Sequence, residues 1–274
     1  MLLSFAAGAA PIFLTKNYFD RHARENSDII ASTGQDFVHR LIDMDPKSYW
    51  VSQGSSDAIT ETITFGLWLP NGKTLREVDT ILIQNHNIKG LTVETSADGG
   101  ATYTTRFTSA AVTDANTRIN QAALYDVDTV RITMTTTQTA NAEKQIGDII
   151  VAAGQLQASI RPNVYRRKAP RVGHKSAEMA DRSIRRAYIF WSDASYHQFE
   201  ATFGFTFIPA AERTTFRDLL LGFEPLIMLP EPGDEQADVI LGQVVPESYI
   251  DDWMAPSHSG DYAISFDFQG VGGA

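Results

Sequence analysis

Residues 60 to 69 read TETITFGLWL, with polar and apolar side chains alternating at the centre of the run and several β-branched residues. Such alternation is typical of a strand that is buried on one face only. Four further runs, at residues 80–84, 91–96, 129–134 and 146–152, are also rich in β-branched residues, and several of them alternate in the same way. Together these runs predict a half-exposed antiparallel sheet.

Turn signals separate these runs. Pro70-Asn71-Gly72 and Asp98-Gly99-Gly100 supply residues that accept the positive φ angles of hairpin turns. Short strands separated by such turns are typical of an all-β sandwich or barrel, and helical periodicity is scarce in this part of the chain. The fold is therefore predicted to be mainly β.

The strand pattern returns after residue 186 with one helix inserted. Strand-like alternation covers residues 186–191 and 198–208, and Pro209 then suits the first turn of a helix that ends near Gly222. Its apolar residues recur at three- and four-residue spacing, at Phe216, Leu219, Leu220 and Phe223. Further strands are predicted at residues 226–229, 239–245 and 262–268.

Charge divides the 274 residues into three parts. Residues 1–154 contain 12 Lys and Arg against 17 Asp and Glu (net −5), residues 155–186 contain 9 against 2 (net +7), and residues 187–274 contain 2 against 14 (net −12). We therefore predict domains at 1–154 and 187–274, joined by a basic linker or arm at 155–186. The total of −10 argues against a specific nucleic-acid partner, because such binding neutralises phosphates.

The apolar run from Met1 to Leu14 fits neither a membrane anchor nor a signal peptide. A spanning helix needs ~20 apolar residues and a secretory signal begins with basic residues, whereas the first basic residue here is Lys16. We expect a strand or arm packed on the body or on a neighbouring subunit, and no membrane span. The chain has no cysteine, which excludes disulfides and thiolate metal sites.

No catalytic motif is complete, so we expect neither enzyme activity nor a cofactor. His86 has Ser96 and Asp98 nearby in sequence, but the chain has no Gly-x-Ser-x-Gly elbow and no His-Glu-x-x-His pair. Since Asp98 is accounted for by its turn, His86 is predicted to be a structural or surface histidine.

Asp43 and Asp45 are candidate ligands of a structural calcium ion. No further acidic group follows them in register, although calcium takes about six to eight oxygen ligands. The favoured interpretation is therefore a turn in which these carboxylates accept backbone N–H bonds.

Candidate residues for binding a sugar are Tyr49, Trp50 and Trp68, through stacking of exposed rings, and His86 and Asn87, through polar contacts. The alternative is that the aromatic residues belong to the core, as is more frequent in a sandwich of this size. Trp50 in particular is expected to be buried.

Segments in the first half resemble, in the same order, the discoidin-like or galactose-binding-like jelly roll. They are residues 41–50 (LIDMDPKSYW), 77–87 (EVDTILIQNHN), 93–100 (VETSADGG) and the closing pair 130–133 (VRIT) and 146–151 (IGDIIV). The resemblance spans about residues 15–153 and implies an N-terminal jelly-roll β-sandwich. It implies no particular ligand, because family members bind sugars, lipids, proteins or nothing detectable.

The second half is similar to the β-sandwich-plus-helix modules of phage tail tubes, distal tail proteins and baseplate hubs. The likeness lies in residues 199–207, the following helix, and residues 225–232 (PLIMLPEP), 241–245 (LGQVV) and 262–268. It implies a homo-oligomeric ring around the DNA exit path of the virion, made in the bacterial host cytoplasm, with other tail tube, hub or baseplate proteins as partners. An acidic ring would repel the DNA rather than bind it.

The basic segment is predicted to be an assembly element that contacts the acidic second domain of its own or an adjacent subunit. Its cations include Arg161, Arg166, Arg167, Lys168, Arg171, Arg185 and Arg186. The alternatives are a solvated flexible linker and a contact with DNA near the mouth of the tube.

A structural tail-tip or baseplate protein is thus the favoured function. The alternative is a receptor-binding protein that recognises host cell-surface glycan through its N-terminal domain. A glycan-active enzyme is disfavoured, because neither half contains a recognisable pair of catalytic carboxylates.

Overall fold

The structure is a computed structural model, which describes residues 12–14, 17–19, 28–43, 48–54, 56–67, 69, 74–153, 156–157, 164–167, 196–220, 226–229, 240–253 and 261–273. The chain forms two compact units. The first unit is Thr15–Gln155, and the second joins Met1–Leu14 to Leu156–Ala274.

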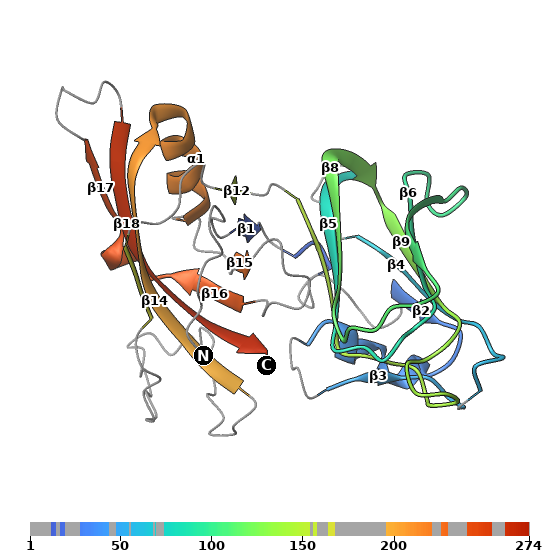
Figure 1. The fold of residues 1–274 in the computed structure, drawn as a ribbon. Helices are drawn as coiled ribbons and strands as arrows, with labels where there is room; N and C mark the ends of the chain where they lie inside the picture. Colours follow the sequence, from blue (N-terminus) through green and yellow to red (C-terminus); the bar gives the residue numbers. More distant parts are fainter. Residues whose placement is uncertain are drawn as a thin grey trace, which may run out of the picture. The chain divides into compact units, whose positions relative to one another are not determined.

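The first unit is built from short strands that pair antiparallel. Its elements are β2 (Ile29–Ala31), the 3-10 helix η3 (Gln35–Leu41), β3 (Trp50–Val51), β4 (Glu61–Gly66), β5 (Arg76–Gln84), β6 (Leu91–Ser96), β7 (Thr104–Ser109), β8 (Thr117–Val127), β9 (Thr129–Met134), β10 (Gln145–Ile146) and β11 (Asp148–Ala152). One sheet has five strands in the order β2-β4-β9-β6-β7, and a second has three in the order β11-β5-β8. Figure 1 shows β5 and β8 in one layer and β4, β6 and β9 in the other, so the predicted mainly β sandwich is confirmed.

The core of this unit lies between the two sheets. Along β4, β6 and β9 buried and partly exposed residues alternate, so Ile63, Val93 and Ile132 enter the core while their neighbours face outward. The opposite sheet contributes residues such as Ile81 and Ile149. Full burial of one such side chain stabilises the fold by about 1.5–3 kcal/mol.

A hairpin turn joins β6 to β7 at the predicted position. Gly99 and Gly100 have φ angles of 72° and 87°, which an L side chain rarely adopts. Oδ1 of Asp98 accepts hydrogen bonds from Oγ of Ser96 at 2.6 Å and from the backbone N–H of Thr102 at 2.9 Å. Together with a bond from the Thr102 hydroxyl to Oδ2, these bonds lower the pKa of Asp98 to about 2. The second predicted turn, Pro70-Asn71-Gly72, lies outside the described residues.

The second unit contains one sheet of eight strands. Its elements are β1 (Ile12–Leu14), β12 (Leu156–Gln157), β13 (Val164–Arg167), β14 (Tyr196–Pro209), α1 (Ala210–Leu220), β15 (Leu226–Leu229), β16 (Ile240–Val244), the 3-10 helix η4 (Pro246–Ser248), β17 (Ile250–Trp253) and β18 (Asp261–Gly273). The strands follow the order β12-β1-β15-β16-β18-β14-β13, and β17 also pairs with β18. The predicted helix and the strands expected after it are confirmed. The strand expected at residues 186–191 lies outside the described residues.

The longest antiparallel ladder of this sheet joins β14 and β18 (Figure 1). Buried phenylalanines stack along it, with ring centroids 5.5 Å apart for Phe203 and Phe266 and 6.2 Å apart for Phe205 and Phe266. Among the described residues, no helix is long and apolar enough to cross a membrane.

Two predicted boundaries differ from the structure. Residues 12–14 were assigned by sequence to the first domain, but β1 pairs with β12 and β15 and so belongs to the sheet of the second unit. The strand expected in the N-terminal run is therefore present, but it packs in the second unit and not in the first. The physical reason is that an apolar strand is stabilised wherever a sheet offers a free edge, which sequence order does not fix.

The basic segment is also not wholly a linker. Arg166 and Arg167 belong to β13, which pairs with β14 and stands at one end of the strand order of its sheet. The other cations predicted for assembly, Arg161, Lys168, Arg171, Arg185 and Arg186, lie outside the described residues. A strand of four residues was not predicted here because its Val-Tyr-Arg-Arg sequence has too short an apolar pattern.

Candidate functional site

His86 is buried inside the first unit. Its Nδ1 accepts a hydrogen bond from the backbone N–H of Ile88 at 3.1 Å, and its Nε2 lies 2.9 Å from Oγ1 of Thr117. Burial lowers the pKa of His86 to about 4, so the ring is neutral, and because Nδ1 accepts, Nε2 carries the proton. Both ring nitrogens are engaged within the fold, which makes His86 a structural histidine.

Asn87 holds two loops together. Its Oδ1 accepts a hydrogen bond from the backbone N–H of Gln145 at 2.9 Å, and its Nδ2 donates to the carbonyl of Glu143 at 2.8 Å. The backbone N–H of Gln138 donates to the Asn87 carbonyl, also at 2.8 Å. The loop after β5 is thereby fixed to the loop before β10, and the amide predicted to contact a ligand is used for this purpose.

Asp57 and Lys144 fix further loops at the same end of the sandwich. Oδ2 of Asp57 accepts a hydrogen bond from the backbone N–H of Asn141 at 3.2 Å, and its Oδ1 accepts one from Oγ1 of Thr137 at 3.0 Å. The bond from Asn141 is the main cause that lowers the pKa of Asp57. Lys144 is buried, and its Nζ donates to the carbonyl of Ser56 at 3.3 Å. The polar groups of these loops thus bind one another.

The aromatic candidates do not form an exposed cluster among the described residues. Trp50 is 0% exposed, as expected for a core residue. Tyr49 is half-buried, and its carbonyl accepts a hydrogen bond from a terminal nitrogen of Arg40 at 3.1 Å. Trp68 lies outside the described residues.

The calcium candidates are only partly described. Asp43 follows η3 and is half-buried, whereas Asp45 lies outside the described residues. Within the described part of the chain, no group of three or more His, Cys, Asp or Glu is placed to hold a metal ion. A structural calcium ion at Asp43 and Asp45 stays a prediction.

The outer face of the five-stranded sheet carries two rows of polar side chains. Strand register sets Thr108, Thr92, Thr133 and Thr62 side by side in one row across β7, β6, β9 and β4. The second row is Thr105, Glu94, Arg131 and Thr64, on the same strands. Neighbouring strands lie about 4.8 Å apart, so each row is a continuous line of side chains. We call this surface the outer face.

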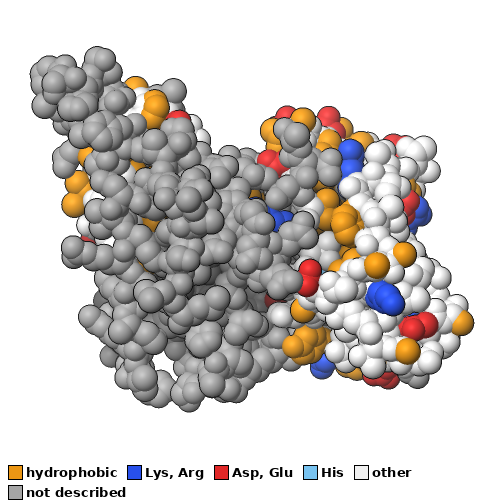
Figure 2. Space-filling model, in the orientation of Figure 1, with side chains coloured by type: hydrophobic (Ala, Val, Ile, Leu, Met, Phe, Trp, Pro, Cys, Tyr) orange, Lys and Arg blue, Asp and Glu red, His pale blue; other side chains and the backbone are white. Residues whose placement is uncertain are grey.

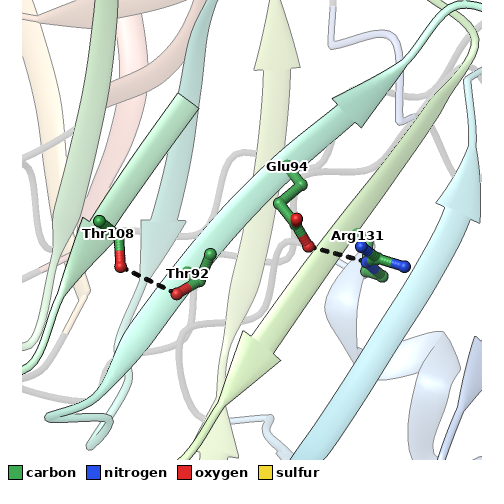
Figure 3. Close-up of polar contacts among 4 residues, drawn as sticks. All are labelled: Thr92, Glu94, Thr108 and Arg131. Atoms are coloured by element: carbon green, nitrogen blue, oxygen red, sulfur yellow. Dashed lines mark hydrogen bonds and ion pairs between the residues drawn. The ribbon is translucent and has the colours of Figure 1, made fainter. Parts of the chain in front are cut away.

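Glu94 and Arg131 form the only ion pair within these two rows. Nε of Arg131 donates to Oε2 of Glu94 at 2.8 Å, and Figure 3 shows the two side chains pointing toward each other from β6 and β9. Thr92 and Thr108 are joined in the same way by a hydrogen bond of 3.0 Å between their hydroxyl oxygens (Figure 3). The bond to Glu94 raises the pKa of Arg131 above its ordinary value.

Tyr103 holds the other side of Arg131. The guanidinium carbon lies 3.7 Å from the centre of the Tyr103 ring, a distance typical of cation–π stacking. Arg131 is therefore held by a hydrogen bond and by stacking, and its side chain remains 35% exposed, against 17% for Glu94.

The outer face retains hydrogen-bonding groups that the fold does not use. Within the described part of the chain, the terminal nitrogens of Arg131 and Oε1 of Glu94 make no hydrogen bond. The hydroxyls of Thr62, Thr64 and Thr133 are likewise without a partner there. A fixed donor and a fixed acceptor thus stand side by side on a half-exposed surface. In the view of Figure 2, the described surface is largely uncharged, with acidic and basic side chains scattered over it.

The sequence predicts three of the four strands that carry these rows, but it does not predict the site. Residues 91–96 and 129–134 were predicted as strands, and alternation places Glu94 and Arg131 on outward faces. The pairing itself depends on register between strands that are 37 residues apart in sequence, which a pattern of alternation does not fix. The sequence signal for the site is one charged residue at an outward position of each strand, Glu94 in the first and Arg131 in the second.

Comparisons with known proteins concern the first unit. No protein-family model matches this chain, and neither does any curated protein. A chitosan-binding module 1 from a chitosanase/glucanase of Paenibacillus sp. IK-5 is 16% identical, with a TM-score of 0.41, and the match covers 51% of this chain and 99% of the module. The family 32 carbohydrate-binding module of Clostridium perfringens NanJ, solved in complex with galactose, is 16% identical, with a TM-score of 0.38, and covers 47% of this chain and 96% of its own.

A third similar structure is CpGH89CBM32-6 produced by Clostridium perfringens, at 17% identity and a TM-score of 0.38, which covers 46% of this chain and 92% of its own. The likeness to such modules extends over about half of this chain. Identities this low say nothing about what this chain binds. The resemblance of the second unit to phage tail proteins stays a prediction.

Proposed function

We propose that this chain is a non-catalytic glycan-recognition protein, whose first unit binds sugar on the outer face. One observation carries the proposal. Glu94 and Arg131 are held side by side on that face, with an acceptor on one and donors on the other unused by the fold. Sugar hydroxyls both donate and accept hydrogen bonds, so adjacent donor and acceptor groups are complementary to them.

Preorganisation favours this role. The Arg131 guanidinium is fixed by Glu94 and Tyr103 before any ligand arrives, so binding orders few additional side chains. Its terminal nitrogens form a planar fork that suits two oxygens of one ligand.

A non-catalytic role fits the state of the titratable groups. The groups with the most perturbed pKa values, His86, Asp98 and Tyr125, are respectively buried, bound in a hairpin turn and packed against the core. A catalytic acid or base has to reach its substrate. We therefore expect no hydrolysis of polysaccharide or peptidoglycan by the purified chain.

The second unit supports a further candidate function, assembly into a phage tail tip or baseplate. The observation that favours it is the position of β13, with Arg166 and Arg167, at the end of the strand order of the eight-stranded sheet. A basic strand at a sheet edge suits contact with an acidic neighbour. In this proposal the second unit forms a homo-oligomeric ring with other tail proteins, and the first unit recognises host glycan.

Glycan-array binding by the full chain tests the main proposal, followed by titration calorimetry with the best sugar. Arg131→Gln should lower affinity by about ten-fold, because it removes the charged fork. Lys89→Gln is the matched control, since it removes one exposed cation from the loop after β5. Equal binding by Arg131→Gln and Lys89→Gln, or no glycan bound by the wild type, would overturn the proposal.

A further inference from the structure

Building on the proposed glycan binding, we infer that Glu94 sets the charge selectivity of the outer face, which takes neutral sugars and rejects sugars that carry a carboxylate. Glu94 thus acts as a specificity-determining residue. It positions Arg131 for sugar hydroxyls and opposes the one ligand class that arginine otherwise favours most.

The first step is the position of the carboxylate. Glu94 bonds Nε of Arg131 through Oε2, and its Oε1 makes no hydrogen bond within the described part of the chain. With a side chain 17% exposed, Glu94 is the more buried partner of the pair. A ligand bound to the terminal nitrogens of Arg131 therefore lies next to a fixed negative charge.

The second step is the charge of the surface around the pair. Across the two rows the remaining side chains are threonines, at 62, 64, 92, 105, 108 and 133. Threonine hydroxyls bond neutral or charged ligands alike and add no charge. Glu94 and Arg131 cancel to a net charge of zero, so the rows hold no surplus cation to attract an acidic sugar.

The third step is the difference between the two ligands. A pair of adjacent sugar hydroxyls can accept a bond from Arg131 and donate one to Oε1 of Glu94. A ligand carboxylate also accepts from Arg131, but it cannot donate to Glu94 and it meets a like charge there. Specificity of this kind rests on a repulsive group as well as an attractive one.

The test uses two pairs of sugars on the full chain, galactose with galacturonic acid and glucose with glucuronic acid. Each pair differs only in a carboxylate at C6. For the pair that binds, the wild type should prefer the neutral member by about three- to ten-fold. Glu94→Gln should remove that preference or reverse it. The preference of the wild type should also shrink in 1 M salt, where the Debye length is ~3 Å.

Matched variants separate selectivity from loss of fold. Glu143→Gln removes an exposed carboxylate on the loop before β10 and should keep the wild-type preference. Glu94→Asp keeps the negative charge, so it should also keep the preference for the neutral sugar, even where affinity falls. Melting temperatures of all variants show whether each is folded.

The outcomes distinguish this inference from the proposed function. If the wild type binds none of the four sugars and no glycan on the array, the proposed function fails, and this inference with it. If the wild type binds sugar but prefers the acidic member, or if Glu94→Gln keeps the same preference, the inference on Glu94 is wrong while glycan binding stands.

Discussion

Oδ1 of Asn87 accepts a hydrogen bond of 2.9 Å from the backbone N–H of Gln145, and so one side-chain amide fixes the start of β10. The same amide donates to the carbonyl of Glu143 at 2.8 Å. Backbone groups near the end of a sheet need partners when the ladder stops. Asn87 supplies two of them, to residues that lie 58 and 56 positions further along the sequence.

Asn87→Ala should lower the free energy of unfolding of the first unit by about 1–3 kcal/mol, because a part-buried backbone donor and an acceptor lose their partner. Thermal unfolding followed by circular dichroism measures the change. Thr139→Ala, at an exposed position of the neighbouring loop, is the control and should leave the melting temperature nearly unchanged. Glycan binding by Asn87→Ala at temperatures where it is folded should equal that of the wild type. A loss of binding with unchanged stability would show that Asn87 contacts ligand.

The fold was predictable because its signals are local. Alternation in residues 129–134 indicates a strand with one buried face. Asp98-Gly99-Gly100 indicates a hairpin turn, because glycine readily adopts the positive φ angles that the turn needs. The membership of residues 12–14 was not predictable in this way. A strand of three residues gives no information on which sheet it joins.

The candidate site was predicted less well, because a residue type does not reveal whether the fold already uses its polar atoms. His86 and Asn87 have the chemistry of ligand contacts, yet their side chains bond Ile88, Gln145 and other backbone groups. Glu94 and Arg131 become a site only through register between β6 and β9. Such information is tertiary and is absent from the spacing of residues along the chain.

His86 should make the first unit less stable as pH falls from about 6.5 to 4. Its folded pKa of about 4 lies below the ordinary value of 6.5. The unfolded state therefore binds a proton in this window while the folded state does not, so stability is complete above pH 6.5 and is lost toward pH 4. The difference corresponds to about 3 kcal/mol.

Urea unfolding at a series of pH values measures this loss. His86→Gln should be less stable than the wild type at pH 7, since it disturbs the bond to Thr117, but its stability should change less between pH 6.5 and 4. Protonation of Asp98 lowers the stability further only at lower pH, because its pKa is lowered from 3.8 to about 2. Parallel pH profiles for wild type and His86→Gln above pH 4 would show that His86 is not the group responsible.

Trp50→Ala should lower the free energy of unfolding by about 3–5 kcal/mol, the usual cost of deleting a large buried aromatic side chain. Trp50 is 0% exposed and pairs with Ile146 in the register between β3 and β10. Differential scanning calorimetry of the full chain measures the change, and Trp50→Phe should cost less because it leaves a smaller cavity. Loss of sugar binding at unchanged stability would contradict the burial of this residue.

Gly100→Ala should weaken sugar binding on the outer face, because it displaces Tyr103. Gly100 has a φ of 87°, and a Cβ added there would lie 2.9 Å from the hydroxyl oxygen of Tyr103. The ring has to move, and with it the surface on which Arg131 stacks at 3.7 Å. We expect a stability loss of about 1–2 kcal/mol from the strained φ angle and a several-fold weaker affinity for sugar.

Gly99→Ala is the matched control, because its φ of 72° is also positive but no atom lies within 4 Å of the added Cβ. Affinity that falls equally in the two variants would show that Tyr103 does not position Arg131.

Reversing charge in the basic segment should disrupt assembly. Arg166, Arg167 and Lys168 changed together to Glu would remove three cations from a chain whose residues 187–274 carry 14 acidic against 2 basic residues. A single exposed ion pair contributes only ~0.2–1 kcal/mol, but several across one interface fix its register. We expect the wild type to form an oligomer whose mass falls as salt rises, because the Debye length shortens to ~3 Å at 1 M. The Glu variant should stay smaller at low salt, and the same three residues changed to Gln should give an intermediate result.

Light scattering coupled to size exclusion measures the mass, and circular dichroism checks that the sheet with β13 is intact. An unchanged oligomer of the Glu variant at low salt would exclude the assembly role, whereas intact rings that no longer bind DNA would favour contact with nucleic acid instead.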